Sequence, residues 1–150
     1  MNQLDLVSSL MTKKLITVNP EDNLLEVKQI FEKHRIHHIP VVRYRSIVGL
    51  VSKSDFVAYE KGMKRHEHEE DKVFHESRLK IYKAQDIMTT GLAKVTSTDR
   101  LNVVIEIFKE NLFHAIPVVD DEELVGIITT YDIIKALASE KAGFDYNQPT

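Results

Sequence analysis

Cysteine is absent from the 150 residues of this chain, which excludes a disulfide framework, a thiolate metal site and a cysteine nucleophile. No apolar run approaches the roughly 18 residues that a membrane-spanning helix requires. Residues 1–10 also lack the basic start and the long apolar stretch of a signal peptide. From these absences we expect a cytoplasmic protein that has no membrane partner.

The charge of the chain is modest and unevenly placed. Hydrophobic residues make up 43% and charged residues 29%, which is the profile of a soluble globular protein. The net charge of −3 argues against a nucleic-acid binder. Residues 7–59 hold eight Lys or Arg and five Asp or Glu, whereas residues 84–139 hold four and nine. The two halves therefore differ in sign.

An internal repeat organises the sequence. Shifted by 77 residues, residues 7–60 align with their own second copy without a gap, and 17 of 54 positions are identical. Most other apolar positions exchange one apolar residue for another, so we infer a duplication. The matched segments include 10–12 with 87–89, 37–42 with 114–119, 48–49 with 125–126, and Asp55 with Asp132.

Each copy shows the same order of secondary-structure signals: strand, helix, two strands and helix. A short apolar run, 15–18 or 92–95, is suited to the first strand. The second and third strands, 39–42 with 47–51 and 116–119 with 124–128, have short polar links and predict hairpins. The apolar positions of the first helices are Leu24, Val27, Ile30 and Phe31 in one copy and Leu101, Val104, Ile107 and Phe108 in the other.

The ends of the helices are also marked in the sequence. Asp22, and Ser97 or Thr98, lie near the starts of the first helices, where side-chain oxygens can cap free N–H groups. The second helices are expected to start near Lys53 and Thr130.

The repeat divides the chain into copies at 1–61 and 84–140, a connector at 62–83 and a tail at 141–150 that we expect to be flexible. A copy of about 55 residues buries too little surface to be secure alone. We therefore expect an α/β fold in which two copies, related by a pseudo-twofold axis, pack sheet to sheet. The charged connector predicts a solvated helix that extends the preceding one, and a regulatory or partner-binding arm is the alternative.

Three motifs occur in both copies in the same order. Met-Thr at 11–12 and 88–89 precedes the first strand, His-x-x-Pro-Val-Val begins at His37 and His114, and Gly-x-x-[Ser/Thr]-x-x-Asp follows in the third strand. On these motifs the chain resembles the CBS-domain pair, or Bateman module, over roughly residues 4–139. The resemblance implies a ligand-sensing module that binds adenine nucleotides in clefts between the repeats.

The third motif spans the end of a strand and the first turn of a helix, where free N–H groups suit phosphate. The hydroxyl of Ser52 or Thr129 can add a hydrogen bond, and the carboxylate of Asp55 or Asp132, one turn later, can accept from two ribose hydroxyls. The alternative is structural, because Ser/Thr-x-x-acid is also a capping box. The resemblance favours ribose and phosphate contacts in at least one copy.

The resemblance also implies where the base lies. Adenine is expected between Ile16 and Ile36, or between Ala93 and Phe113, with the backbone of the first strand reading its edge. Ordinary core packing of these side chains is the alternative.

The same resemblance places His37, His38 and His114 at the phosphates. A structural role as a partly buried residue at the end of a strand is the alternative for each histidine. Lys53, Arg43 and Arg45 add positive charge in the first copy, whereas residues 120–123 make the second hairpin acidic. Pro40 and Pro117 lie inside strands and are interpreted as structural. The predicted nucleotide-binding residues are Thr12, Ile16, His37, His38, Ser52, Lys53, Asp55, Thr89, Ala93, His114, Thr129 and Asp132.

We therefore expect a regulatory module without catalysis that binds AMP, ADP or ATP. S-adenosylmethionine is a further candidate ligand, and Mg²⁺ is expected only with a bound nucleotide. The alternative function is a protein-interaction or dimerisation module with vestigial pockets. An enzyme is disfavoured because no catalytic triad order or Gly-rich phosphate loop occurs, and a metal protein because His66, His68 and His75 fit a solvated helix face.

The resemblance implies a disc-shaped homodimer of two modules. The opposite charges of the two halves favour a head-to-tail pairing of the subunits. The output of the module is expected to pass through an effector protein that the sequence does not identify.

Overall fold

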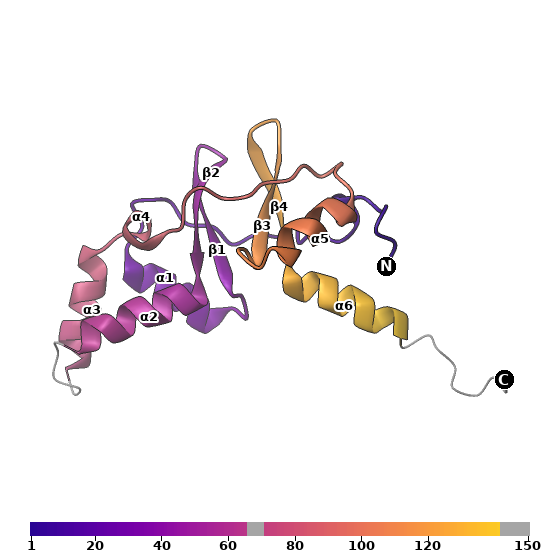
Figure 1. Ribbon diagram of the computed structural model, residues 1–150. Coiled ribbons are helices and arrows are strands. Elements are labelled where there is room, and N and C mark those ends of the chain that lie inside the picture. Colours follow the sequence, from indigo (N-terminus) through magenta and orange to yellow (C-terminus); the bar gives the residue numbers. More distant parts are fainter. Residues whose placement is uncertain (66–70, 142–150) are drawn as a thin grey trace. The chain divides into compact units, whose positions relative to one another are not determined.

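A computed structural model describes residues 1–65 and 71–141 (Figure 1). In these residues the chain is a mixed α/β protein with two small antiparallel sheets and six α-helices. The elements are η1 (Val7–Ser9), α1 (Leu24–Lys33), β1 (His38–Arg43), β2 (Ser46–Ser52), α2 (Lys53–Lys64), α3 (Lys72–Ile81), α4 (Ala84–Ile87), α5 (Leu101–Lys109), β3 (Ala115–Asp120), β4 (Glu123–Thr129) and α6 (Thr130–Lys141). The helix and hairpin signals of both copies are confirmed.

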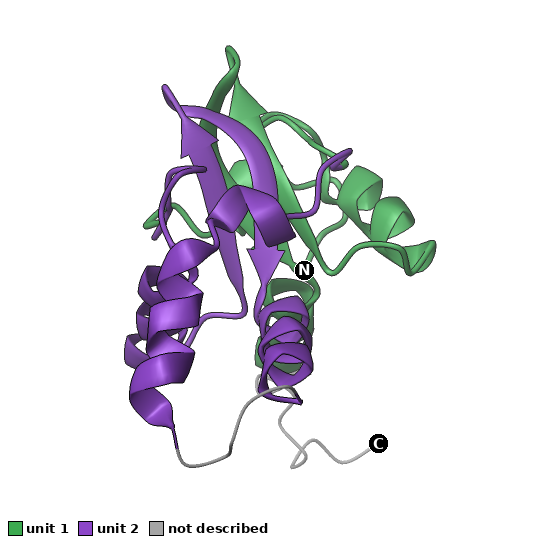
Figure 2. Cartoon of the chain, turned by 90° about the vertical axis from the view of Figure 1, so that its left-hand side faces the viewer, with its two compact units in different colours: residues 1–15, 93–150 green, residues 16–92 purple. Residues whose placement is uncertain are grey.

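The chain forms two compact units whose boundaries differ from those of the sequence repeats (Figure 2). Unit 2 is Ile16–Leu92, and unit 1 joins Met1–Leu15 to Ala93–Thr150. The first fifteen residues therefore belong with the second repeat, and residues 84–92 belong with the first.

The core of unit 2 forms between α1, its hairpin and α2. The helical spacing of Leu24, Val27 and Phe31 places these side chains on one buried face of α1. They share a core with buried residues of β1 and β2, among them Ile39 and Val51. The ring of Phe56 on α2 lies 5.9 Å from that of Phe31.

Unit 1 repeats this arrangement around α5. Leu101 and Val104 pack with Ile116 and Ile128 of the hairpin. Val7 joins the same cluster and is fully buried. The N-terminal segment thus contributes to the core of unit 1.

The hairpins are alike in register and in turn geometry. Each has a register shift, opposite Val41/Val42 and Val118/Val119, where the second strand contains one extra residue. Each also turns through two residues of positive φ, Tyr44 with Arg45 and Asp121 with Glu122. Two such residues make the type I′ turn that suits the twist of a hairpin.

The predicted first strands are reduced to single bridges. Val18 bridges Val41 in parallel, and Val95 bridges Val118 in the same way. The N–H of Val18 donates to the carbonyl of Pro40, and its carbonyl accepts from Val42. The prediction of strands at 15–18 and 92–95 is therefore wrong beyond one residue each.

The helix caps also differ from the expectation. The side chain of Asn23 caps α1 by accepting from the N–H of Glu26 at 3.0 Å, whereas Asp22 accepts from the N–H of Asn19 in the preceding turn. In unit 1 the position before α5 is Arg100, which provides no side-chain cap. The sequence placed polar residues near the helix starts without fixing which one has the extended backbone of an N-cap.

The connector does not extend α2, and it is not fully solvated. α2 ends at Lys64, and the separate helix α3 packs against α1 with Leu79 and His75 buried. The buried face of α3 consists of only two residues one helical turn apart, which were too few to predict this packing from the sequence. Residues 66–70, with His66 and His68, and the tail after Lys141 lie outside the described residues.

Candidate functional site

The Gly-x-x-Ser-x-x-Asp motif of unit 2 joins β2 to α2. β2 ends at Ser52, whose extended backbone makes it the N-cap of α2. The Ser52 Oγ accepts from the N–H of Asp55 at 3.1 Å. The Asp55 side chain is exposed. Among residues 1–65 and 71–141 its carboxylate has no hydrogen-bond or ion-pair partner, so both oxygens can accept from a ligand.

In the same motif of unit 1, the Thr and Asp residues form hydrogen bonds with each other. Thr129 Oγ1 accepts from the N–H of Asp132 at 3.2 Å. In return, Asp132 Oδ2 accepts from the N–H of Thr129 at 2.9 Å and from its hydroxyl at 3.0 Å. Asp132 is 7% exposed, and its other oxygen lies 3.6 Å from the Lys135 ammonium. This is the reciprocal capping box that formed the structural alternative to a ribose site.

The predicted histidines lie next to the helix starts. The N–H of Lys53 donates to the carbonyl of His37 at 2.8 Å, and the N–H of Thr130 donates to the carbonyl of His114 at 3.0 Å. His37 and His114 are exposed, and His38 is half-buried. The structure therefore brings His37, Lys53 and Ser52 together in unit 2, and His114 and Thr129 in unit 1.

The hairpin charges do not lie near these motifs. In the register of the first hairpin His38 pairs with Ser52, whereas Arg43 pairs with Ser46 at the other end. Five residues of strand span about 17 Å. Arg43 pairs instead with the carboxylate of Glu21. The expectation that Arg43 and Arg45 lie near the phosphate end is wrong, because strand length separates them from it.

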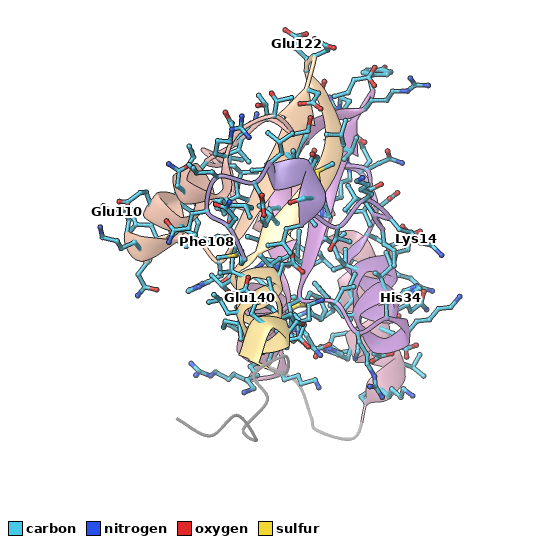
Figure 3. The ribbon with its side chains drawn as sticks, turned by 90° about the vertical axis from the view of Figure 1, so that its right-hand side faces the viewer. Lys14, His34, Phe108, Glu110, Glu122 and Glu140 are labelled. Carbon is cyan, nitrogen blue, oxygen red and sulfur yellow. The ribbon has the colours of Figure 1, made fainter. Side chains whose placement is uncertain are left out.

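The acidic hairpin of unit 1 has the same geometry. Figure 3 shows Glu122 at the tip of the β3–β4 hairpin, and Glu140 on α6, which follows the other end of β4. Asp120 and Glu123 pair beside this tip, while Ala115 pairs with Thr129. The acidic tip is therefore distant from the Thr129 motif.

Thr12 and Thr89 each lie beside the motif of the other repeat. Thr12 exchanges two backbone hydrogen bonds with Ile127, at 2.8 and 3.0 Å. Thr89 exchanges two with Leu50, at 3.0 and 2.8 Å. Each pairing lies two residues before the Ser52 or Thr129 cap. The Met-Thr segment of one repeat thus fixes the strand that leads to the helix start of the other.

The methionine and glycine of the motifs explain why the Met-Thr segment of one repeat pairs with a strand of the other. The sequence analysis did not predict this pairing. A Cβ on Gly49 would overlap the Met88 side chain, and a Cβ on Gly126 would lie 2.6 Å from the Met11 sulfur. Only glycine leaves room for these side chains on the strands. The signal was the occurrence of Met-Thr and Val-Gly together in both copies, read as two separate motifs.

The residues expected at the base are half-buried. Ile16 and Ile36 belong to unit 2, and Ala93 and Phe113 belong to unit 1. Ile36 also packs against the core of unit 2. Within the described part of the chain, the backbone N–H and C=O groups of Ile16 and Ala93 form no hydrogen bond.

A cluster of charges lies outside these motifs, under the connector helix. Glu60 Oε2 lies 3.0 Å from His75 Nε2 and 3.0 Å from the Lys28 ammonium, which joins α1, α2 and α3. Burial tends to raise the pKa of Glu60, but the hydrogen bonds from His75 and Lys28 outweigh it and hold this pKa below its usual value.

Within the part of the chain that the structure describes, no group of three or more histidine, aspartate or glutamate side chains is placed to hold a metal ion. None of the helices described there is long and apolar enough to span a bilayer.

Several curated proteins are similar to this chain. Inosine-5'-monophosphate dehydrogenase of Methanocaldococcus jannaschii is 29% identical over 135 residues, which are 89% of this chain and 24% of that enzyme. Two uncharacterized proteins of the same organism, MJ0188 and MJ1225, are 29% and 24% identical. The chain spans 43% and 48% of their lengths, so it covers less than half of each of these three relatives.

Solved structures share the fold. The CBS domain pair of protein MJ0100, in complex with 5-methylthioadenosine and S-adenosyl-L-methionine, has a TM-score of 0.74 at 23% identity. CBSX2 in complex with AMP has a TM-score of 0.72 at 24% identity. Each alignment covers 91% of this chain and 98% of the other.

The family model of the CBS domain matches the chain twice, at residues 7–62 and 84–139. These matches cover both sequence repeats and both motif ends described above. The chain therefore belongs to the CBS-domain family and carries two CBS domains in tandem.

Proposed function

We propose that the chain is a regulatory module that senses an adenine nucleotide or a related adenosyl ligand. The observation that carries this proposal is the start of α2. There the free, exposed carboxylate of Asp55 lies one turn from the Ser52 cap, with His37 beside the first N–H of the helix. A ribose diol needs such a two-oxygen acceptor, and a phosphate is favoured by the helix N-terminus and by nearby cations.

The chemistry of the two units supports different ligands. In unit 2 Lys53, His37 and His38 offer positive charge, so we assign AMP, ADP or ATP to this unit, with Mg²⁺ only as the companion of a polyphosphate. In unit 1 the capping box occupies one oxygen of Asp132, and His114 is the predicted phosphate contact. A ligand with less negative charge, such as S-adenosylmethionine, suits unit 1 better.

Two solved relatives support the adenosyl class. The structure of CBSX2 holds AMP, and that of the MJ0100 domain pair holds 5-methylthioadenosine and S-adenosyl-L-methionine. Four of the predicted ligand positions hold the same kind of residue in both copies of the repeat: Thr12 and Thr89, His37 and His114, Ser52 and Thr129, and Asp55 and Asp132. We infer no catalytic step, because the motifs supply binding groups and no general base or nucleophile aimed at a reacting atom.

The signal requires a ligand that binds one arrangement of the module better than another. We propose that the module acts as a homodimer in the cytoplasm and passes its conformational change to an effector protein. The opposite charges of the two repeats support a head-to-tail pairing of subunits.

The second candidate function is a protein-interaction module without a physiological nucleotide. The closed capping box of Thr129 and Asp132 favours it for unit 1, because a purely structural role accounts for every contact of these side chains. A ligand that binds to unit 2 alone would reconcile both functions.

The direct test replaces Asp55 with Asn and measures AMP and ATP binding by calorimetry. We expect an affinity at least about tenfold lower, since the amide has lost one acceptor and the negative charge that strengthens hydrogen bonds from hydroxyls. The helix should remain intact, because the cap is made by the Ser52 hydroxyl and the Asp55 N–H.

The matched control is Glu32→Gln, which removes an exposed carboxylate from α1. Equal affinities in the wild type, Asp55→Asn and Glu32→Gln proteins would show that Asp55 does not hold the ribose. A wild-type protein whose melting temperature responds to no adenine nucleotide or S-adenosylmethionine would leave the interaction module as the function.

A further inference from the structure

Unit 1 is completed by residues that are distant from the rest of it in the sequence. Residues 1–15 belong to this unit, whereas the stretch that follows them, Ile16–Leu92, forms unit 2. Unit 2 needs no such addition, because it is one continuous stretch of the chain. Residues 1–12, which we call the strap, are therefore a separate piece that unit 1 has to acquire.

The strap supplies the hydrogen bonds at the start of α5. Arg100, the residue before α5, makes no side-chain cap. The N–H of Leu101 donates instead to the carbonyl of Asp5 at 2.9 Å, and the N–H of Asn102 donates to the carbonyl of Gln3 at 2.8 Å. The first N–H groups of a helix have no partner within that helix. Without the strap, the start of α5 would therefore lack these acceptors.

The strap also fills the core of unit 1. Val7 is fully buried in the apolar cluster of α5 and its hairpin, and Leu10 and Met11 pack against the same cluster. Thr12 exchanges two backbone hydrogen bonds with Ile127, at 2.8 and 3.0 Å. An empty Val7 position would leave a cavity lined by apolar side chains, which is destabilising. Unit 1 is thus incomplete until a strap occupies it.

The link between the strap and unit 2 is held only at its ends. Thr12 pairs with Ile127 in unit 1, and Val18 pairs with Val41 in unit 2. Among the residues that the structure describes, the backbone groups of residues 13–17 form no hydrogen bond. Five residues of extended chain span about 17 Å. This link can therefore redirect the strap without breaking a backbone hydrogen bond.

We propose that the strap is exchangeable: unit 1 accepts it either from its own chain or from a second copy of the chain. An exchanged strap makes the same hydrogen bonds and apolar contacts, and only the conformation of residues 13–17 differs. Two copies that exchange straps tether unit 2 of each copy to unit 1 of the other. This inference rests on the head-to-tail homodimer of the proposed function and names a contact that builds it.

The test uses the absence of native cysteine. Leu6 and Arg100 form an antiparallel bridge, and the residues on either side of them make the hydrogen bonds. Such a non-hydrogen-bonded pair has its Cα atoms about 4.5 Å apart, which a disulfide can span. Leu6→Cys/Arg100→Cys should therefore form a disulfide on oxidation, within one chain or between two.

The decisive experiment mixes the two single variants. Leu6→Cys and Arg100→Cys are unfolded together in urea under reducing conditions, refolded as a mixture and oxidised. A disulfide between positions 6 and 100 then requires the strap of one chain to lie in unit 1 of the other. We expect this mixed dimer on a non-reducing gel, and peptide mass spectrometry identifies the disulfide. The control mixes Arg100→Cys with Tyr44→Cys, at a hairpin residue that is 94% exposed, and should give no comparable dimer.

Shortening the link should favour exchange. Removal of the exposed residues Lys13 and Lys14 should shift the disulfide of Leu6→Cys/Arg100→Cys from within the chain to between chains, because a short hinge disfavours the closed form. The matched control removes Thr90 and Gly91, the residues at the related positions of the second repeat. Strap exchange cannot relieve that deletion, so the disulfide should be distributed as in the parent protein.

The inference is overturned if the double variant forms its disulfide within the chain while the mixture of single variants gives no mixed dimer. It is also overturned if the double variant forms no disulfide, because positions 6 and 100 would then not be paired. A wild-type dimer in light scattering that lacks the mixed disulfide rejects strap exchange and keeps the homodimer. A wild-type protein that is only monomeric removes the homodimer together with this inference, and AMP binding in calorimetry tests the sensing function separately.

Discussion

At the scale of single residues, identical motif letters have different chemical states in the two copies. Asp55 is exposed, and its carboxylate has no partner among the residues that the structure describes, whereas Asp132 is buried and accepts two hydrogen bonds from Thr129. The sequence predicted both as candidate ribose acceptors, and it also predicted the capping alternative. It could not decide between them, because the difference lies in burial and side-chain rotamer and not in residue type.

Glu60 gives the clearest residue-level dependence on pH. Its pKa is lowered in the folded protein, so its contribution to stability is present above the unfolded value near 4.5 and is lost as the pH falls through the folded value. Glu60→Gln should therefore destabilise the protein by about 1–2 kcal/mol at pH 7, because hydrogen bonds to Lys28 and His75 lose their charged acceptor.

Urea unfolding of the wild type and of Glu60→Gln from pH 7 to pH 3 checks this prediction. The difference between the two proteins should be constant above about pH 5 and should shrink below 4.5. A difference that grows on acidification would contradict the assigned sign. Glu106→Gln, which removes an exposed carboxylate that pairs with Lys109 on α5, is the control and should change little.

At the scale of elements, the pattern of apolar residues predicted the helices and strands whose buried faces depend on that pattern. The apolar faces of α1 and α5 follow from residue spacing, the strands of both hairpins follow from their short apolar runs, and the structure contains them. The first strands were not predictable in the same way, because their pairing ends where Pro40 and Pro117 lack a donor. A helix in the connector was predicted, but the packing of α3 was not, since two buried side chains hold it and its other apolar residues, such as Val73 and Ile81, are exposed.

The packing of α3 leads to a prediction about stability. Leu79 is fully buried, so Leu79→Ala should cost about 2–5 kcal/mol by leaving a cavity between α3 and the core of unit 2. Ile81→Ala removes a side chain that is 70% exposed on the same helix and should cost well under 1 kcal/mol. Chemical denaturation of both variants measures the contrast. Equal, small losses would mean that α3 is a solvated arm after all.

At the scale of the whole molecule, the two sequence repeats and the two compact units have different boundaries. The repeat alignment groups Thr12 with Asp55 and Thr89 with Asp132, whereas the backbone pairs Thr12 with Ile127 and Thr89 with Leu50. The sequence revealed the duplication and the shift that aligns its two copies. An alignment of a chain with itself cannot show which copy a segment packs against.

This exchange predicts crossed effects of the two methionines. Met11→Ala should raise hydrogen exchange in β4, and Met88→Ala should raise it in β2, because each side chain packs on the glycine of that strand. Mass spectrometry of peptides covering Glu123–Thr129 and Ser46–Ser52 separates the two strands. Leucine at either position keeps most of the volume and should restore protection. Exchange that rises within the same repeat as the substitution would rule out the crossed assignment.

The crossed segments also set an order for folding as the chain leaves the ribosome. Unit 2 is one continuous stretch, Ile16–Leu92, so all of its strands and helices have been synthesised before Ala93 and the residues that follow it in unit 1. Residues 1–15 precede unit 2 in the chain, yet Val7 and Thr12 find their partners only when Leu101, Ile116 and Ile127 have followed. Closing so long a loop is slow. Residues 1–15 are thus ordered after unit 2, although they are synthesised before it.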